Sequence, residues 1–479
     1  MKKNVTLIAV LLLLSSCNNR AAKNPWSYAP ACYDNPWTPS PSQKEAIPRC
    51  LLMETADSCC EQNEECAEED AYSLAELIDT ALIRSPQTKE TWSIARIAAA
   101  EYGLGQSPYY PEIDFNAFFL ATRDPGFFGS RFLFIDEFRE YAPYISLNYL
   151  VLDFGTTRAK SRALYQRLMA ANWIHNDEIQ KVIQNVSLDY YSYITDRDKV
   201  AAGEANLHDA ETTLGATEAK HGRGIVSITD VLTAKTTVSK QTIELLNDEQ
   251  SVADSLAKLL AEAGLPANAC VGVANIIDEI DVDEFLDSVD HFLCLAYDLR
   301  PDLHAAYARV LSDESSVKAA QRDQLPQVSL SATTGQYYFN SGRLNDYGYN
   351  AQLSLNFPLF RGWYYANQIR EAKARLELSQ AQLRDVELQM VRQVVTSYQD
   401  FNFATEKVRV NKEFVALAEE TFEANLAEYK TGTVDITTLV NSQTNLANAR
   451  YSLAEARKQW YDALTNLTYA SGLAQKGTR

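Results

Sequence analysis

Two segments of the chain alternate apolar and polar residues with a period of two. Between 112 and 119 the odd positions are apolar and the even ones mostly polar, and 327–332 alternates in the same way. Further along, the related sequences SLNYLVLDFG, at 146–155, and SLNFPLFRG, at 354–362, continue the alternation. This period is that of a β-strand with one apolar and one polar face. The pattern therefore predicts four strands.

These strands pair into two predicted β-hairpins, at 112–151 and 327–358. The connecting segments, 124–140 and 335–348, are rich in Gly, Asp and aromatic residues and are expected to be long loops. A two-faced strand suits either a half-buried soluble sheet or a membrane barrel with lipid outside and water inside. Four strands cannot close a barrel, since the smallest barrels have about eight, and unpaired strand edges in lipid are prohibitive. If the strands cross a membrane, several chains must therefore build one barrel.

After each hairpin the pattern changes to a helical period. Apolar residues recur every three or four positions from Ile179 to Tyr193 and from Val391 to Phe401. Proline is absent between 144 and 265 and after 358, so nothing in these stretches interrupts a helix. The segment 156–220 alone holds 65 residues and, if helical throughout, reaches ~97 Å. Such a length is typical of a coiled-coil array and exceeds a compact core.

Hairpin and helices occur twice, which indicates a duplicated helix–hairpin–helix repeat. Gly155 and Gly362 close the two related strand sequences, and the next matched glycines, Gly224 and Gly432, follow 69 and 70 residues later. Because the spacing is conserved between the two copies, the repeated sequence indicates that a whole structural unit has been duplicated. The predicted segments are repeat 73–272, linker 273–286, repeat 287–470 and C-terminal tail 471–479.

The first sixteen residues have the pattern of a secretory signal peptide. Two lysines precede the apolar run 5–14, which is too short to span a bilayer. The run ends in Leu14-Ser15-Ser16-Cys17, which resembles the lipobox of bacterial lipoproteins, whose cysteine is acylated. An ordinary small-residue cleavage site before a cysteine is the alternative. By the same resemblance, Asn18 favours sorting to the outer membrane. We therefore expect a signal peptide at 1–16 and a lipidated extension at 17–72.

Seven cysteines remain besides Cys17, and five of them crowd the Pro-rich extension, which also holds Asn-Pro-Trp triplets at Asn24 and Asn35. Export makes disulfides the favoured use of these cysteines. A zinc site is the alternative, but no CxxC pair occurs. Cys270 and Cys294 are candidates for a further disulfide. The five cysteines of the extension are Cys32, Cys50, Cys59, Cys60 and Cys66.

Charge and motif content exclude several function classes. The net charge is -19, from 63 acidic and 44 basic residues, which argues against nucleic acid as a partner. The chain has no HExxH and no GxxxxGK[ST] sequence, and GLGQ at 103–106 lacks the third glycine of a dinucleotide fingerprint. We therefore expect no catalytic site, no cofactor and no metal site.

Three further sequence motifs resemble those of a known family. GIVSITDV at 224–231, YKTGTVDITTL at 429–439 and PLFRG at 358–362, in this duplicated layout, resemble the TolC-type outer membrane efflux protein family over roughly 73–470. The resemblance implies a mixed membrane β-barrel plus long α-helical barrel, with twelve strands completed in a homotrimer. It also implies an exit duct of a tripartite pump or type I secretion system in the outer membrane. Its partners would be a periplasmic adaptor, an inner membrane transporter and outer membrane lipid.

The same resemblance points to residues that close the periplasmic tip of the duct. Asp230 matches an acidic position of the first repeat, and Tyr429 matches a family tyrosine. In the second repeat Thr438 and Asn441 stand where members of the family can carry Asp, and Val434 stands where they can carry Arg. The duct is therefore expected to be closed at its tip either by a ring of carboxylates from Asp230 alone or by a different set of contacts. A solvated helix face for Asp230 and packing between helices for Tyr429 are the structural alternatives.

One other function fits the long helices. A lipid-anchored, disulfide-linked structural or adhesive coiled-coil protein of the envelope would also contain a signal peptide and a Cys-rich extension. Such a rod has no need of two alternating hairpins, however, so the strands favour the duct.

Overall fold

The computed structural model describes residues 26, 29–30, 32–38, 72–128, 132–267, 269, 271–274, 288–339 and 346–474. These residues form two compact units. The sheet unit comprises Met1–Ala29, Ile94–Asn172 and Ala305–Arg384, and the helical unit comprises Pro30–Ser93, Trp173–His304 and Asp385–Arg479. Each unit thus takes segments from both repeats. No helix among the described residues is both long and apolar enough to cross a membrane.

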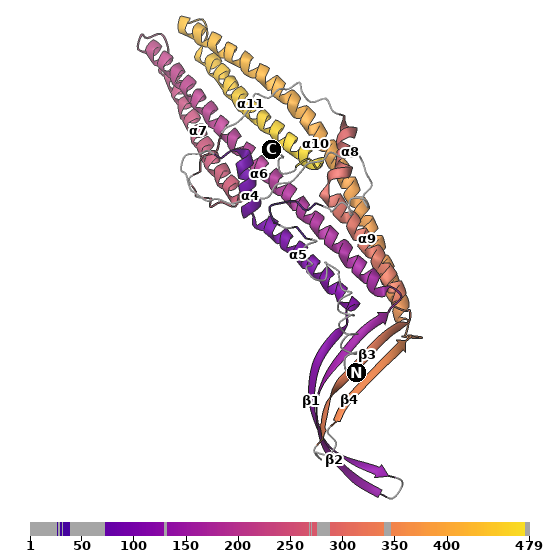
Figure 1. The fold of residues 1–479 in the computed structure, drawn as a ribbon. Helices are drawn as coiled ribbons and strands as arrows, with labels where there is room; N and C mark the ends of the chain where they lie inside the picture. The colour runs from indigo at the N-terminus through magenta and orange to yellow at the C-terminus, as the bar shows by residue number, and fades with distance from the viewer. Residues whose placement is uncertain are drawn as a thin grey trace. The chain divides into compact units, whose positions relative to one another are not determined.

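The sheet unit is built on four antiparallel strands in the order β1-β2-β3-β4 (Figure 1). Residue pairs Glu112↔Asn148 and Gln327↔Asn356 start the two hairpins, and Asn148↔Ser331 joins them through β2 and β3. The predicted hairpins are thus confirmed, and they form one continuous sheet. Its strands are β1 (Glu112–Phe128), β2 (Phe132–Leu152), β3 (Gln327–Phe339) and β4 (Asp346–Asn356).

The first connecting loop is much shorter than predicted. The strands of the first hairpin continue to Phe128 and resume at Phe132, so most of the predicted loop 124–140 is strand. This stretch contains Phe127, Phe128, Phe134 and Ile135, and aromatic and β-branched residues favour strands over loops.

Each returning strand passes to a long helix through two consecutive residues in the left-handed region. In the first repeat these are Phe154 (φ 51°) and Gly155 (φ 88°), and in the second Gly362 (φ 54°) and Trp363 (φ 65°). Helix α6 (Thr156–His221) begins directly after Gly155, and α10 (Tyr364–Thr431) directly after Trp363. The remaining helices of this unit are the C-terminal part of α5 (Pro86–Gln106), the short η2 (Ser107–Tyr109) and most of α9 (Pro301–Arg322).

The helical unit packs two long helical hairpins and two short helices. Its core joins α4 to α6 and α7 through buried Leu77, Val186, Ile194 and Leu259. Helix α6 holds 66 residues, so the prediction of one helix over 156–220 is confirmed. Besides α6 and α10, the helices here are α4 (Leu74–Arg84), α7 (Ile228–Glu262), α8 (Val289–Leu299) and α11 (Ile436–Ala470).

A described part of the N-terminal extension docks on the helical unit. The ring of Trp37 packs edge-to-face on Trp173 of α6, with 5.4 Å between ring centroids. Asn176 binds the backbone of the same Trp37 on both sides: its Oδ1 accepts from the amide at 2.6 Å and its Nδ2 donates to the carbonyl at 2.8 Å. The second Asn-Pro-Trp triplet is therefore an anchor for the extension.

Candidate functional site

The four-stranded sheet has one polar and one apolar face, as the alternation predicted. On the polar face Asn116 donates to Ser146 at 3.0 Å, and the hydroxyls of Ser329 and Ser354 lie 2.8 Å apart. On the other face the side chains are exposed although apolar, with Phe115 at 73 % and Leu355 at 68 %. Water on one side and a non-aqueous environment on the other would satisfy both faces.

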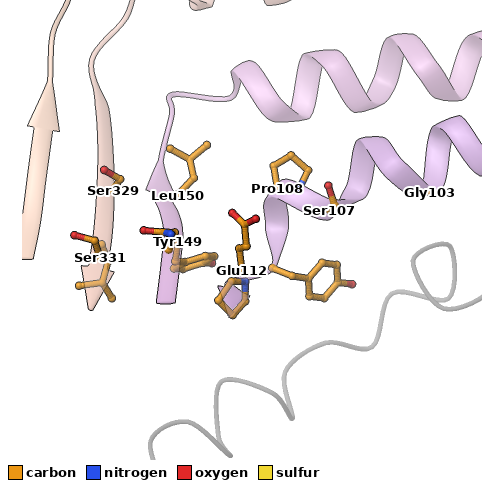
Figure 2. A pocket seen from close by; sticks show the side chains of 12 residues that line it. Gly103, Ser107, Pro108, Glu112, Tyr149, Leu150, Ser329 and Ser331 are labelled. Carbon is orange, nitrogen blue, oxygen red and sulfur yellow. The ribbon is translucent and has the colours of Figure 1, made fainter. Parts of the chain in front are cut away.

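A cavity of about 860 Å³ lies at the helix-proximal end of this sheet, next to η2 (Figure 2). Its lining brings Glu112 and Asn148 together with Ser329, Ser331 and the apolar Leu150. Glu112 is the one titratable carboxylate among the lining residues.

The two long helical hairpins turn at the predicted glycines. Gly224 and Gly432 have φ of 76° and 93°, a conformation that glycine adopts without steric cost. After each turn a side chain caps the next helix: Ser227 accepts from the amide of Asp230 at 3.2 Å, and Asp435 accepts from that of Thr438 at 2.8 Å. These caps fix the residues at which α7 and α11 begin after the two turns.

The four predicted tip residues make separate contacts in the structure. Asp230 completes a capping box, because its carboxylate accepts from the amide of Ser227 at 3.1 Å. Thr438 and Asn441 are exposed. Among the described contacts, no hydrogen bond joins any two of the four. Their role in closing the tip stays a prediction.

Tyr429 instead joins two helices of its own chain. Its side chain is 2 % exposed, and its hydroxyl donates to Thr217 of α6 at 3.1 Å. The ammonium of Lys220 lies 4.0 Å from the centre of its ring and also donates to the Tyr429 carbonyl. Tyr429 therefore ties α10 to α6, which is the packing role named as the structural alternative.

A polar seam joins the two hairpins farther from the turns, and the sequence did not predict it. We use this name for Asn206 and Asp209 on α6, Asp248 on α7, and Arg450 and Tyr451 on α11. Arg450 Nη1 lies 2.9 Å from both Asn206 Oδ1 and Asp209 Oδ2. Its Nη2 also lies 3.6 Å from Glu419 of α10. One guanidinium thus contacts α6 and α10 from α11.

The second contact of the polar seam is Tyr451, whose hydroxyl donates to Asp248 Oδ2 at 2.7 Å. Burial raises the pKa of Asp248, against the smaller opposite effect of this hydrogen bond. Burial and the Asp248 carboxylate together raise the pKa of Tyr451. The raised pKa of Tyr451 keeps its hydroxyl protonated as the donor of this hydrogen bond.

Most of the cysteines named in the predictions, including Cys50, Cys59, Cys60 and Cys66 of the extension, lie outside the described residues, so disulfides in the extension stay a prediction. Cys17 and Cys270 lie outside the described residues, so lipidation and the Cys270–Cys294 disulfide stay predictions. Cys294 is exposed on α8.

Comparison with known proteins decides the family. The model of the outer membrane efflux protein family matches residues 77–265 and 293–473. The chain belongs to the outer membrane efflux protein family. The two matched segments bracket the two hairpins and the long helices that follow them, so the family pattern covers both units.

Relatives of this efflux protein are distant but match over most of their length. It is 24% identical to protein CyaE of Bordetella pertussis over 387 residues, which cover 80% of each chain. It is 21% identical to outer membrane protein TolC of Escherichia coli over 428 residues, which cover 84% of this chain and 82% of TolC. The crystal structure of VceC from Vibrio cholerae superposes with a TM-score of 0.74 at 19% identity, covering 83% of this chain and 96% of VceC. The fold of the efflux protein is thus that of a TolC-like channel.

Proposed function

We propose that this efflux protein is the outer membrane channel of a tripartite efflux pump or type I secretion system. It provides the exit duct from an inner membrane transporter to the outside. The proposal rests on the sheet, which has one polar face and one apolar face whose side chains are exposed. The chain that carries this sheet belongs to the outer membrane efflux protein family. The polar face would line the water-filled duct and the apolar face would contact lipid.

The proposed assembly is a homotrimer with a periplasmic adaptor and the transporter as partners. Four strands leave two unpaired sheet edges, and lipid tolerates none. Three copies would supply twelve strands, which is within the range of closed barrels. The long helices would extend from this barrel into the periplasm.

Reconstitution tests the channel directly. The purified full-length chain, placed in a planar lipid bilayer, should conduct ions as a trimer. Leu355→Arg puts a charge on the apolar face and should reduce insertion, since Arg on the lipid-facing side of a barrel costs up to about 2–4 kcal/mol at the bilayer midplane and less near the interfaces. Ser354→Arg, its neighbour on the polar face, should insert and shift ion selectivity toward anions. A non-conducting monomer or dimer would instead favour the structural or adhesive alternative.

Anchoring through Cys17 is a separate part of the proposal. Several acyl chains on one cysteine would hold the chain firmly at the membrane, whereas one chain binds marginally. Cells grown with labelled palmitate should label the wild-type chain, and Cys17→Ser should remove the label. Equal labelling of both chains would rule out this anchor.

For closure of the duct we propose that Asp230 supplies a ring of acid at the periplasmic tip. Asp230→Asn removes the charge yet keeps an oxygen that can accept from Ser227, so the helix cap is preserved. The variant should conduct more and be blocked less by multivalent cations added on the tip side. Unchanged conductance and block would remove Asp230 from the closure.

A further inference from the structure

A second cavity, of about 320 Å³, lies between α7 and α11 in the helical unit. Its lining residues are mostly polar. Gln241, Glu244 and Asp248 come from α7 at spacings of three and four, so they share one helix face. Thr444, Asn448 and Tyr451 come from α11 at spacings of four and three. A coiled-coil seam normally holds apolar side chains at such positions, so this stretch requires another explanation.

Gln241 is the observation that points to a ligand. Its side chain lines the cavity and is only 5 % exposed. Its Oε1 has no hydrogen-bond partner among the described residues. A buried oxygen without a partner costs about 1–3 kcal/mol, and native structures hold few of them. A ligand in the cavity that binds the Gln241 Oε1 would remove this unfavourable free energy.

The charges beside Gln241 define the sign of that occupant. Glu244 and Asp248 lie four residues apart on α7, and like charges at this spacing repel. Lys240 also lines the cavity, and its ammonium lies 3.6 Å from Glu244, with the Lys240 side chain 61% and the Glu244 side chain 37% exposed. An exposed pair of this kind separates at little cost, so the ammonium can swing out into solvent when another cation binds. Tyr451 binds Asp248 Oδ2 and leaves Oδ1 for a further partner. The cavity therefore favours a cation.

We propose that this cavity binds a hard divalent cation, Ca²⁺ in the first place, through Glu244, Asp248 and the Oε1 of Gln241. Carboxylate and amide oxygens are the ligands that Ca²⁺ takes, and water completes its six to eight positions. Mg²⁺ demands a tighter octahedral set and should bind more weakly. The lining residues carry no Cys or His, which are the ligands that softer metals prefer.

Such an ion would be held by α7, since all three ligands belong to that helix, while α11 forms the opposite wall of the cavity. With two carboxylates the affinity falls at the weak end of the protein range, with Kd of about 10⁻⁴–10⁻³ M. The seam would then be occupied in a calcium-rich medium and empty in a chelating one.

Terbium luminescence tests the site on the full-length chain in detergent after removal of metals. Tb³⁺ replaces Ca²⁺ at oxygen sites, and Tyr451 in the cavity wall can sensitise it. We expect a saturable signal that Ca²⁺ displaces at about 10⁻⁴–10⁻³ M. Glu244→Gln should weaken binding at least tenfold. Asp254→Asn, an equal change of charge at an exposed position of α7, should leave it unchanged.

Gln241→Leu gives a second readout that does not depend on charge. The substitution removes the unpartnered oxygen, so the metal-free protein should melt at a higher temperature than wild type, while the rise in Tm on adding Ca²⁺ should disappear. Equal Ca²⁺ binding in wild type, Glu244→Gln and Gln241→Leu would overturn the site, as would the lack of any saturable signal. Binding is measured on the purified chain, so its failure would leave the channel proposal untouched.

Discussion

The hydroxyl of Tyr451 on α11 donates a 2.7 Å hydrogen bond to Asp248 on α7 beside Gly203 of α6. A Cβ at Gly203 would lie 3.1 Å from the Tyr451 oxygen and 3.2 Å from Asp248 Oδ2. Both distances are tighter than ordinary contacts of a Cβ. The lack of a side chain at 203 therefore allows three helices to meet at one hydrogen bond.

Two glycines of α6 form a matched test of this close approach. Gly215 is exposed and a Cβ there meets no atom within 4 Å, so Gly215→Ala should raise stability by about 0.5–1 kcal/mol through helix propensity. Gly203→Ala gains the same propensity but displaces the Tyr451–Asp248 pair. We expect its Tm to fall below that of Gly215→Ala. Equal Tm values for the two variants would show that the seam accommodates the methyl group.

Removing the Arg450 guanidinium should loosen the polar seam. Arg450→Gln leaves Asp209, whose side chain is 21% exposed, without its cation, which costs about 1–3 kcal/mol. Because Arg450 holds α11 against α6, single-channel recordings should also show a higher open probability. Arg409→Gln is the control, since Arg409 and Glu406 form a surface pair with side chains 68% and 56% exposed. That variant should change stability by less than about 0.5 kcal/mol. Identical behaviour of both variants would contradict a holding role for Arg450.

Histidine 175 should make the helical unit sensitive to mild acid. The side chain is fully buried on α6 and lies 3.0 Å from the Thr91 hydroxyl. Burial lowers the pKa of His175 to about 4, against smaller upward effects of the Asn35 backbone and the Asp34 carboxylate. In the unfolded chain its pKa is about 6.5.

The neutral form is therefore the one that the fold favours. Its contribution is complete above pH of about 6.5 and is lost as the pH falls toward 4, by up to about 3 kcal/mol. His175→Gln keeps a hydrogen-bonding group without this titration. The Tm of the wild type should fall more steeply than that of the variant between these pH values. Parallel curves would show that His175 does not control the acid sensitivity.

Docking of the N-terminal extension depends on Asn176. This side chain is 7 % exposed and satisfies both backbone groups of Trp37. Asn176→Ala leaves both groups without a partner, so limited proteolysis should cut the extension near Trp37 faster, by tenfold or more. Asn185→Ala on the same helix removes a surface contact to Glu262 and should leave the rate unchanged. Fast cleavage in wild type would mean that the docking is not stable.

Periodicity in the sequence was sufficient to predict the strands and helices but not the contacts between them. The alternation at 112–119 and the helical period after Gly155 predict β1 and α6 because each pattern records which side of one element is apolar. The loops predicted at 124–140 and 335–348 were both too long, since β1 and β2 cover most of the first segment and β3 and β4 cover the ends of the second, where aromatic residues favour strands.

The contacts between helices left no such record in the sequence. Arg450 and Asp209 are 241 residues apart, and each is by itself an unremarkable charge on a helix. Asp230 and Tyr429 were found by family resemblance, which marks a position but not the partner of its side chain. Only the packed helices reveal that Tyr429 meets Thr217, whereas the capping box of Ser227 and Asp230 is a local signal that the sequence itself carries.

The left-handed pairs at Phe154-Gly155 and Gly362-Trp363 also determine the rotational phase of the helices that follow them. A left-handed Phe or Trp costs of order 1–2 kcal/mol, so the backbone there is constrained by its surroundings. Each residue of an α-helix advances the side chains by about 100°. One inserted residue at either pair would rotate the start of the 66- or 68-residue helix by about 100° relative to the strand before it. The two short junctions thus determine which face of each helix continues from which face of its strand.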